Sequence, residues 1–149
     1  MSTEYFHSPV GILKIVSDST AIKGISIVEA ETESNGDSIT AEAAKQLREY
    51  FAGERTVFDF PINPDGTDFQ KRVWKVLLGI PYGKALSYGE VAALAGNSKS
   101  CRAVGNAVGK NPILIAIPCH RVKAVNGIGG FSAGIDVKKY LISKENIQI

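Results

Sequence analysis

The sequence has few of the features that mark secreted, membrane or disulfide-rich proteins. Its two cysteines are too few for a disulfide framework, so Cys101 and Cys119 are considered as individual thiols. The longest apolar run, residues 113–117, is far shorter than the ~20 residues that cross a bilayer. The N-terminus lacks the basic-then-apolar order of a secretion signal. We therefore expect an intracellular globular protein, cytoplasmic or, in a eukaryote, nuclear, with no membrane partner.

The charged residues are unevenly distributed, although the net charge is only +2. Residues 1–67 hold 5 Lys and Arg against 11 Asp and Glu, a net charge of −6. Residues 68–149 hold 12 against 4, a net charge of +8. This asymmetry favours a polyanionic partner for the second part. The alternative is that the basic part docks on the acidic part or carries solvated charge only.

The first part has the pattern of a small sheet with one helix. Two β-branched segments flank the polar turn 18–20, which is typical of an antiparallel hairpin. The acidic, polar stretch 29–37 has no apolar period and is predicted to be a loop. We expect strands around residues 4–7, 11–17, 21–28 and 57–60, and a helix capped by Ser38 or Thr40 that ends at Gly53.

The second part has a helical pattern. Apolar residues repeat with a 3.6 period from Phe69 to Ile80, until Pro81 prevents continuation, and Trp74 beside that face is expected in the core. Two short helices joined by a tight turn then predict a helix-turn-helix. We expect these two helices from the Ser87 and Glu90 capping box to Gly96, and from Ser100, capped by Ser98 or Asn97, to about Val108.

The last helix is predicted from Ile135 to about Glu145, with Val137, Tyr140 and Leu141 facing inward. The predicted fold class is therefore α/β (α+β). A small N-terminal domain of antiparallel sheet and helix covers residues 1–66, and a mainly helical C-terminal domain with the helix-turn-helix covers residues 67–149.

The second helix of the predicted helix-turn-helix is built from small residues, and its only large polar groups are Arg102 and Lys110. Its interior glycines, Gly105 and Gly109, each weaken it by about 1 kcal/mol relative to alanine. Small side chains let a helix approach another backbone closely. The sequence leaves open whether that neighbour is nucleic acid or the rest of the protein.

The segment Pro118-Cys-His-Arg-Val122 holds the densest chemistry of the chain. A thiol is a useful nucleophile only as thiolate, and His120 or Arg121 could favour that form. Adjacent side chains of an extended segment point to opposite sides, so Cys119 and His120 need a bridging water or a bend. The alternative is a buried thiol beside a surface imidazole. The spacing of Cys and His does not fit zinc, and the glycine-rich stretch 126–134 lacks a Walker motif, so we interpret it as a flexible turn that lines a site.

Five segments occur here in the order of a known family, and in them the chain resembles the DNA alkylguanine-alkyltransferases. The resemblance is close from Phe69 to Glu145 and loose before that. It implies a DNA repair protein that moves the alkyl group of O6-alkylguanine, and also of O4-alkylthymine, irreversibly to its own cysteine in one turnover. The five segments are Ser87-Tyr88, Arg102-Ala-Val-Gly105, Asn111-Pro112, Pro118-Cys-His-Arg-Val122 and Gly130-Phe-Ser-Ala-Gly134.

The resemblance also implies a binding partner and the way in which it is bound. The partner is double-stranded DNA that contains O6-alkylguanine, bound through the minor groove by a monomer with the damaged base flipped out. No cofactor and no metal are implied. Extruding a base costs a few kcal/mol, which explains why the nucleophile sits on a DNA-binding scaffold.

The roles of single residues are likewise what the resemblance implies. Cys119 is the alkyl acceptor, activated through a water by His120, which Glu145 orients. Asn111 braces the cysteine segment, Tyr88 donates a hydrogen bond to the guanine ring, and Arg102 fills the space of the flipped base. The implied DNA-binding residues are Ser87, Tyr88, Arg102, Ala103, Gly105, Asn106 and Lys110, and the implied substrate pocket is formed by Val122, Phe131, Ser132 and Ala133.

Other functions remain open at this point. One is a DNA-binding regulator, or an alkyltransferase-like protein that binds the lesion without transfer, although the latter usually lacks the cysteine. Another is a cysteine hydrolase that uses Cys119 and His120. Only the alkyltransferase predicts a permanent mass gain on Cys119. Three departures from the family pattern, Cys101, Phe131 and Ala133, concern the width of the pocket and not the nucleophile.

Overall fold

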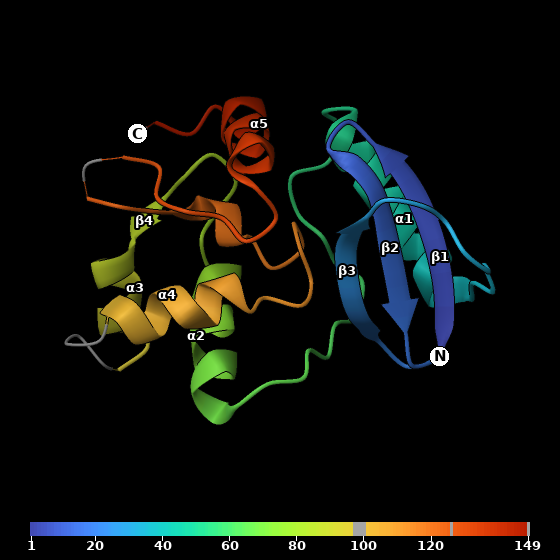
Figure 1. The fold of residues 1–149 in the computed structure, drawn as a ribbon, viewed down its shortest axis with the longest axis horizontal. Helices are drawn as coiled ribbons and strands as arrows, with labels where there is room; N and C mark the ends of the chain where they lie inside the picture. The colour runs from blue at the N-terminus through green and yellow to red at the C-terminus, as the bar shows by residue number, and fades with distance from the viewer. Residues whose placement is uncertain (97–100, 126, 149) are drawn as a thin grey trace. The chain divides into compact units, whose positions relative to one another are not determined.

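The computed structural model describes residues 1–96, 101–125 and 127–148. The chain divides into two compact units, Met1–Asp65 with Pro112–Leu114, and Gly66–Asn111 with Ile115–Ile149. The fold is mixed α/β, with an antiparallel sheet in the first unit and mostly helices in the second, as predicted (Figure 1). In the part of the chain that is described, no helix has the length and apolar character needed to cross a membrane.

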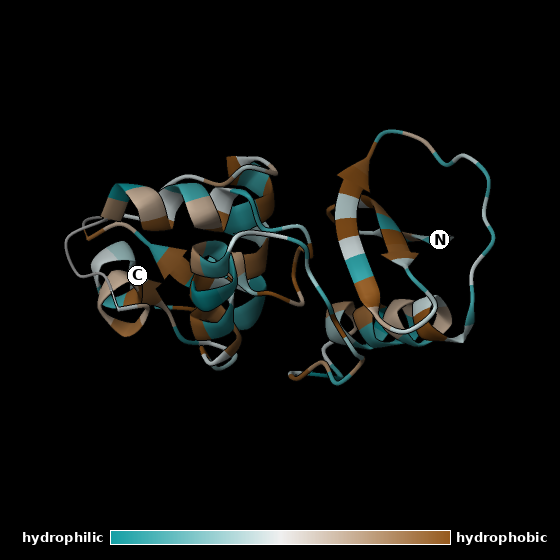
Figure 2. Cartoon of the chain, turned by 90° about the horizontal axis from the view of Figure 1, so that it is seen from below, coloured by the Kyte–Doolittle hydropathy of each residue, from teal (hydrophilic) through white to brown (hydrophobic). Residues whose placement is uncertain are grey.

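The first unit is a three-stranded antiparallel sheet with one helix against it. Strands β1 (Ser2–Ser8), β2 (Gly11–Ser17) and β3 (Ile22–Val28) follow one another in the sheet, so the predicted hairpin and preceding strand are confirmed. Helix α1 (Ser38–Phe51) covers one face (Figure 2). Leu13 and Ile15 of β2 are fully buried, because alternate residues of a strand share a face.

The start of α1 differs from the prediction. Asp37 is the N-cap, and its carboxylate accepts a hydrogen bond from Thr40 N at 2.8 Å. Thr40 Oγ1 in turn accepts from Asp37 N at 2.8 Å and completes a capping box. Ser38 is already the first helical residue. Thr40 therefore contributes to the cap from the third helical position, and the predicted caps Ser38 and Thr40 were both wrong.

The predicted strand at residues 57–60 is also wrong, because this segment has other partners. Asp59 N donates to the Gln46 side chain at 3.0 Å, and Phe58 packs against Tyr50 of α1 with ring centroids 5.4 Å apart. Pro61 follows and has no N–H to give to a ladder. A bridge between Ile22 and Ile62 supplies the strand-like contact instead.

The apolar run 113–117 is divided between the two units. Ile25 N donates to Pro112 O and Leu114 N donates to Ile25 O, both at 3.0 Å, so residues 112–114 extend the first unit. Ile115 then takes a positive φ of 72°, which turns the chain. Before that turn, Ile113 forms a bridge with Ile25.

Three packed helices form the framework of the second unit. They are α2 (Asp68–Leu78), α3 (Tyr88–Leu94) and α4 (Cys101–Gly109). Trp74 is buried and donates its indole N–H to Ala107 O at 2.8 Å, which confirms its place in the core. The predicted turn 97–99, the caps Asn97 and Ser98 and the helix start at Ser100 lie outside the described residues.

The rest of the second unit carries the cysteine segment. A 3₁₀ turn (Cys119–Arg121) leads into β5 (Val122–Lys123), which pairs in parallel with β4 (Leu86–Ser87). Helix α5 (Ile135–Glu145) agrees with the predicted range. Its inward face does not agree, because Tyr140 is 39% exposed whereas Lys138 is fully buried. Leu141 is buried as predicted, and Val137 is partly buried.

Candidate active site

Helix α4 presents a smooth, small-residue surface away from the core. Val104, Ala107 and Val108 are buried, whereas Arg102 and Asn106 are exposed one turn apart. A methyl group built at Gly105 or Gly109 would meet no described atom within 4 Å, apart from the helix backbone itself. Close packing inside the protein therefore does not explain these two glycines, and the exposed side of α4 can approach a partner.

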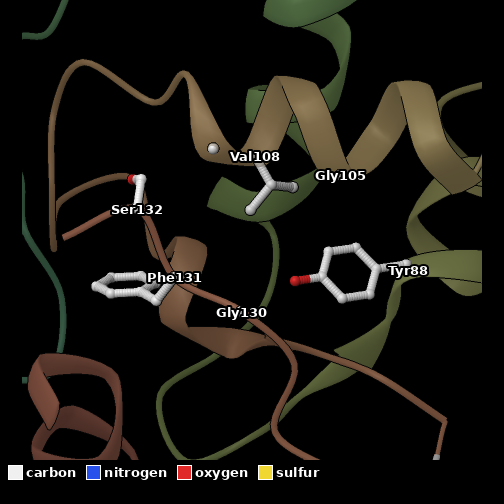
Figure 3. A pocket seen from close by; sticks show the side chains of 7 residues that line it. Tyr88, Gly105, Val108, Gly130, Phe131 and Ser132 are labelled. Atoms are coloured by element: carbon white, nitrogen blue, oxygen red, sulfur yellow. The ribbon is translucent and has the colours of Figure 1, made fainter. Parts of the chain in front are cut away.

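Tyr88 begins α3 and faces a pocket beside α4. Ser87 Oγ accepts from Glu90 N at 3.1 Å and Glu90 Oε1 accepts from Ser87 N at 2.9 Å, so the predicted capping box fixes this helix start. The Tyr88 hydroxyl points into the pocket (Figure 3). Burial raises the pKa of Tyr88, and the nearby Cys119 raises it further, so the hydroxyl stays protonated and can donate.

The pocket has a volume of about 300 Å³. The glycine-rich stretch forms one wall and α4 forms another, with Tyr88 between them (Figure 3). Of the residues that the resemblance implies for the substrate pocket, Phe131 and Ser132 line this cavity, whereas Val122 and Ala133 are not among its lining residues. The full set of lining residues is Tyr88, Gly105, Val108, Gly109, Gly130, Phe131 and Ser132.

The cysteine segment is bent, and a bend is one of the two possibilities that the sequence left open. Cys119 N donates to Ile117 O at 2.8 Å and Arg121 N donates to Pro118 O at 3.0 Å, which closes a 3₁₀ turn. The Cys119 side chain is buried, and its residue is only 1% exposed. Burial raises the pKa of Cys119 to about 11, against the opposing effects of a hydrogen bond with Asn111 and of the Lys138 charge.

Asn111 holds this turn from the end of α4. Its side-chain amide donates to Ile117 O at 2.8 Å, two residues before the cysteine. Together with its hydrogen bond to the Cys119 thiol, this contact ties the cysteine turn to the end of α4. The bracing role that the resemblance implies for Asn111 is thus compatible with its contacts.

His120 and Glu145 meet in the interior, 25 residues apart in the chain. His120 Nε2 lies 2.6 Å from Glu145 Oε2, and both side chains are fully buried. Burial lowers the pKa of His120, whereas Glu145 raises it. A neutral imidazole that donates from Nε2 to the carboxylate has its lone pair on Nδ1. Nδ1 is buried and has no hydrogen-bond partner among the described residues.

Lys138 is a functional candidate that sequence reasoning missed. Its ammonium donates to Val122 O at 2.7 Å and to Gly130 O at 3.0 Å. It also lies 6.0 Å from the ring centres of both Tyr88 and Phe131. Lys138 thus joins the strand after the cysteine to the glycine-rich wall. A lysine in a helix gives no sequence signal of burial, because lysine is mostly a surface residue.

The remaining predicted residues occupy the surface of the same unit. Cys101, Arg102, Asn106 and Lys110 are exposed, and Ala103 is partly buried. Within residues 1–96, 101–125 and 127–148, no group of three His, Cys, Asp or Glu side chains is placed to hold a metal ion. The arrangement is suited to nucleophilic chemistry by a buried thiol next to a proton acceptor, beside a pocket and an open helix face.

Comparison with known proteins decides the family. The 6-O-methylguanine DNA methyltransferase ribonuclease-like domain matches residues 1–64, and the DNA binding domain of the same methyltransferases matches residues 68–147. The chain belongs to the 6-O-methylguanine DNA methyltransferase family. A methylated-DNA--protein-cysteine methyltransferase of Methanosarcina acetivorans is 40% identical over 148 residues, which cover 94% of this chain and 95% of the relative. The relative of that name from Mycobacterium bovis is 42% identical over 145 residues, 93% of this chain and 88% of its own length.

A solved structure of this methyltransferase family includes DNA. The crystal structure of Mycobacterium tuberculosis OGT in complex with DNA matches with a TM-score of 0.89 and 41% identity, and the match covers 97% of this chain and 92% of that one. The family and these relatives favour alkyl transfer over a regulator, a lesion-binding protein or a hydrolase, and Cys119 lies within the matched DNA binding domain.

Proposed function

We propose that this protein repairs DNA by transferring the alkyl group from O6 of guanine to its own Cys119. The observation that carries the proposal is the buried thiol of Cys119, followed by His120, whose Nε2 lies 2.6 Å from the buried carboxylate of Glu145. This arrangement lies in the residue range that matches the DNA binding domain of the methyltransferases. The lesion range that the family resemblance implies also includes O4-alkylthymine.

The thiol needs a base to become nucleophilic. Because burial raises the pKa of Cys119 to about 11, the resting group is a neutral thiol at pH 7. His120 is the acceptor, through its Nδ1 and a bridging water, while Glu145 fixes the imidazole by accepting from Nε2. Charge separation then occurs only when the alkyl carbon is in place, since an isolated buried thiolate would be costly.

The transfer step requires no cofactor. The sulfur of Cys119 forms a bond to the saturated alkyl carbon, and the bond between that carbon and O6 breaks. The electron pair stays on guanine, which takes up one proton in place of the alkyl group, while the thiol proton is lost through His120. Tyr88 supports the leaving base by donating a hydrogen bond to its ring. The product is a thioether, which water does not cleave, so each chain acts once.

The DNA contacts are proposed for the C-terminal domain, residues 67–149, and residues 1–66 form a separate domain. The open small-residue face of α4 supports close approach to the minor groove, with Ser87, Ala103, Gly105 and Asn106 near the backbone. Arg102 fills the space of the flipped base, and Lys110 adds phosphate attraction. The protein acts as a monomer in the compartment that holds the DNA, the cytoplasm or, in a eukaryote, the nucleus.

Intact-protein mass spectrometry after mixing with O6-methylguanine duplex tests the proposal. We expect a gain of one methyl group per chain, located on Cys119 by peptide mapping, and no gain in Cys119→Ala. Cys101→Ala is the matched control, because Cys101 is the exposed thiol, and it should gain the methyl group like the wild type. A methyl group on Cys101, or continued transfer by Cys119→Ala, would contradict the assignment.

A further inference from the structure

Arg121 is buried beside Glu145 and takes no part in the proposed transfer step. Its Nε donates to Glu145 Oε1 at 2.8 Å and its Nη2 donates to Oε2 at 3.1 Å. A third hydrogen bond, from Nη1 to Ile80 O at 2.7 Å, anchors the guanidinium to the chain after α2. The guanidinium also lies 5.8 Å from the ring centre of Tyr82. The arginine is thus held rigidly against both carboxylate oxygens.

Glu145 is shared between this fixed cation and the titratable His120. Oε2 accepts from Arg121 and lies 2.6 Å from His120 Nε2. A buried carboxylate needs a compensating positive charge, because unpaired buried charge is costly. Arg121 supplies that charge permanently, since a guanidinium does not titrate in proteins. Without it, a proton on His120 would supply a positive charge beside Oε2, and the protonated ring would no longer have a free lone pair on Nδ1.

We infer that Arg121 is a positioning residue that neutralises Glu145, so that Glu145 orients His120 without holding it in the protonated state. His120 then enters the reaction as a neutral imidazole whose Nδ1 can accept the Cys119 proton. The inference rests on the proposed function for its consequence, but the charge state of His120 can be measured without DNA. Arg121 acts through Glu145 and His120 and does not itself touch the reacting atoms.

The other titratable groups around His120 do not replace this effect. Lys138 of α5 is a cation that also lowers the pKa of His120, but its ammonium donates to Val122 O and Gly130 O. Cys119 and Tyr88 are neutral at pH 7, since burial raises the pKa of each. Tyr82, from the loop after α2, is kept neutral in the same way.

Two substitutions of Arg121 separate the effect of its charge from the effect of its shape. Arg121→Gln removes the charge and keeps a hydrogen-bonding head, whereas Arg121→Lys keeps the charge and loses the planar fork. Nuclear magnetic resonance titration of the imidazole signals, with His7→Gln to assign the two histidines, reports the pKa of His120 in the free protein. We expect Arg121→Gln to raise that pKa by at least about one unit, which is a tenfold change in proton affinity. Arg121→Lys should leave it near the wild-type value.

The pH profile of alkyl transfer gives the second readout. The acid limb, where His120 protonates, should move to higher pH in Arg121→Gln and stay in place in Arg121→Lys. The control is Arg55→Gln, which removes the partner of Glu49 at 2.9 Å in the first unit and should move neither quantity. A merely structural role of Arg121 would lower stability and leave the His120 pKa and the acid limb unchanged, and that result would overturn the inference.

A further comparison covers the case that Arg121→Gln does not fold. Glu145→Gln and the double substitution Arg121→Gln/Glu145→Gln differ only in the arginine charge. The His120 pKa should be higher in the double variant, and an equal value would refute the effect of Arg121. Failure of the wild type to methylate Cys119 would instead contradict the proposed function, while the titration result would stand by itself.

Discussion

Lys138→Met should uncouple activity from stability. Methionine keeps the apolar stem but removes the ammonium that joins Val122 O to Gly130 O. Two hydrogen bonds from a charged donor contribute about 3–6 kcal/mol in total. Against this, burial lowers the pKa of Lys138 from 10.5 to about 8, a cost of about 3 kcal/mol for holding the cation inside. The difference is a net stabilisation of roughly 0–3 kcal/mol, so we expect Lys138→Met to lose at most about 3 kcal/mol of unfolding free energy.

Alkyl transfer should suffer much more. The glycine-rich wall, residues 130–132, would lose its tie to the strand after Cys119, and small displacements of a site lower rates strongly. We expect at least about a tenfold slower transfer to duplex DNA. Urea unfolding and a single-turnover rate measurement give the two quantities. Lys139→Met, the exposed neighbour on α5, is the control and should change neither. Transfer within twofold of the wild-type rate would refute the reasoning.

The lowered pKa of Lys138 also predicts that the stability of the wild type depends on pH, relative to Lys138→Met. Below pH 8 Lys138 is charged in both the folded and the unfolded protein. Between pH 8 and 10.5 the folded protein loses this proton first, so the unfolded state binds more protons and stability rises with pH. The difference in unfolding free energy between wild type and Lys138→Met should therefore grow in favour of the wild type by up to about 3 kcal/mol. A constant difference over this range would show that Lys138 is not held as a buried cation.

Three further predictions concern DNA and the first unit. Arg102→Ala should slow repair of duplex DNA far more than reaction with free O6-alkylguanine base, which needs no flipping, and equal losses would exclude the wedge role. Lys110→Gln should weaken binding to all sequences alike and reduce the salt slope by about one, in contrast to the control Lys45→Gln, and an unchanged slope would contradict a phosphate contact. Asp37→Ala should cost about 1 kcal/mol of stability in urea unfolding, whereas Asp37→Asn, which can still cap α1, should cost less, and equal costs would argue against the capping role.

Local patterns in the sequence were sufficient where neighbours along the chain decide the structure. The hairpin of β2 and β3 was predictable because a short turn joins its two strands, and the capping box because Ser87 and Glu90 are three residues apart. Choices between adjacent candidates were harder. Asp37, Ser38 and Thr40 can all cap a helix, and only the path of the chain into α1 decided for Asp37.

The sequence by itself predicted Cys119 as the nucleophile, because the motif around it and the order of the other four segments carry the resemblance to the alkyltransferases. It could not determine the environment of that cysteine. The contacts of Glu145 with Arg121 and His120 join residues 24 and 25 positions apart, and the burial of Lys138 depends on carbonyls from two other segments. Charges attract and desolvate according to distance in space, and only the tertiary structure sets those distances.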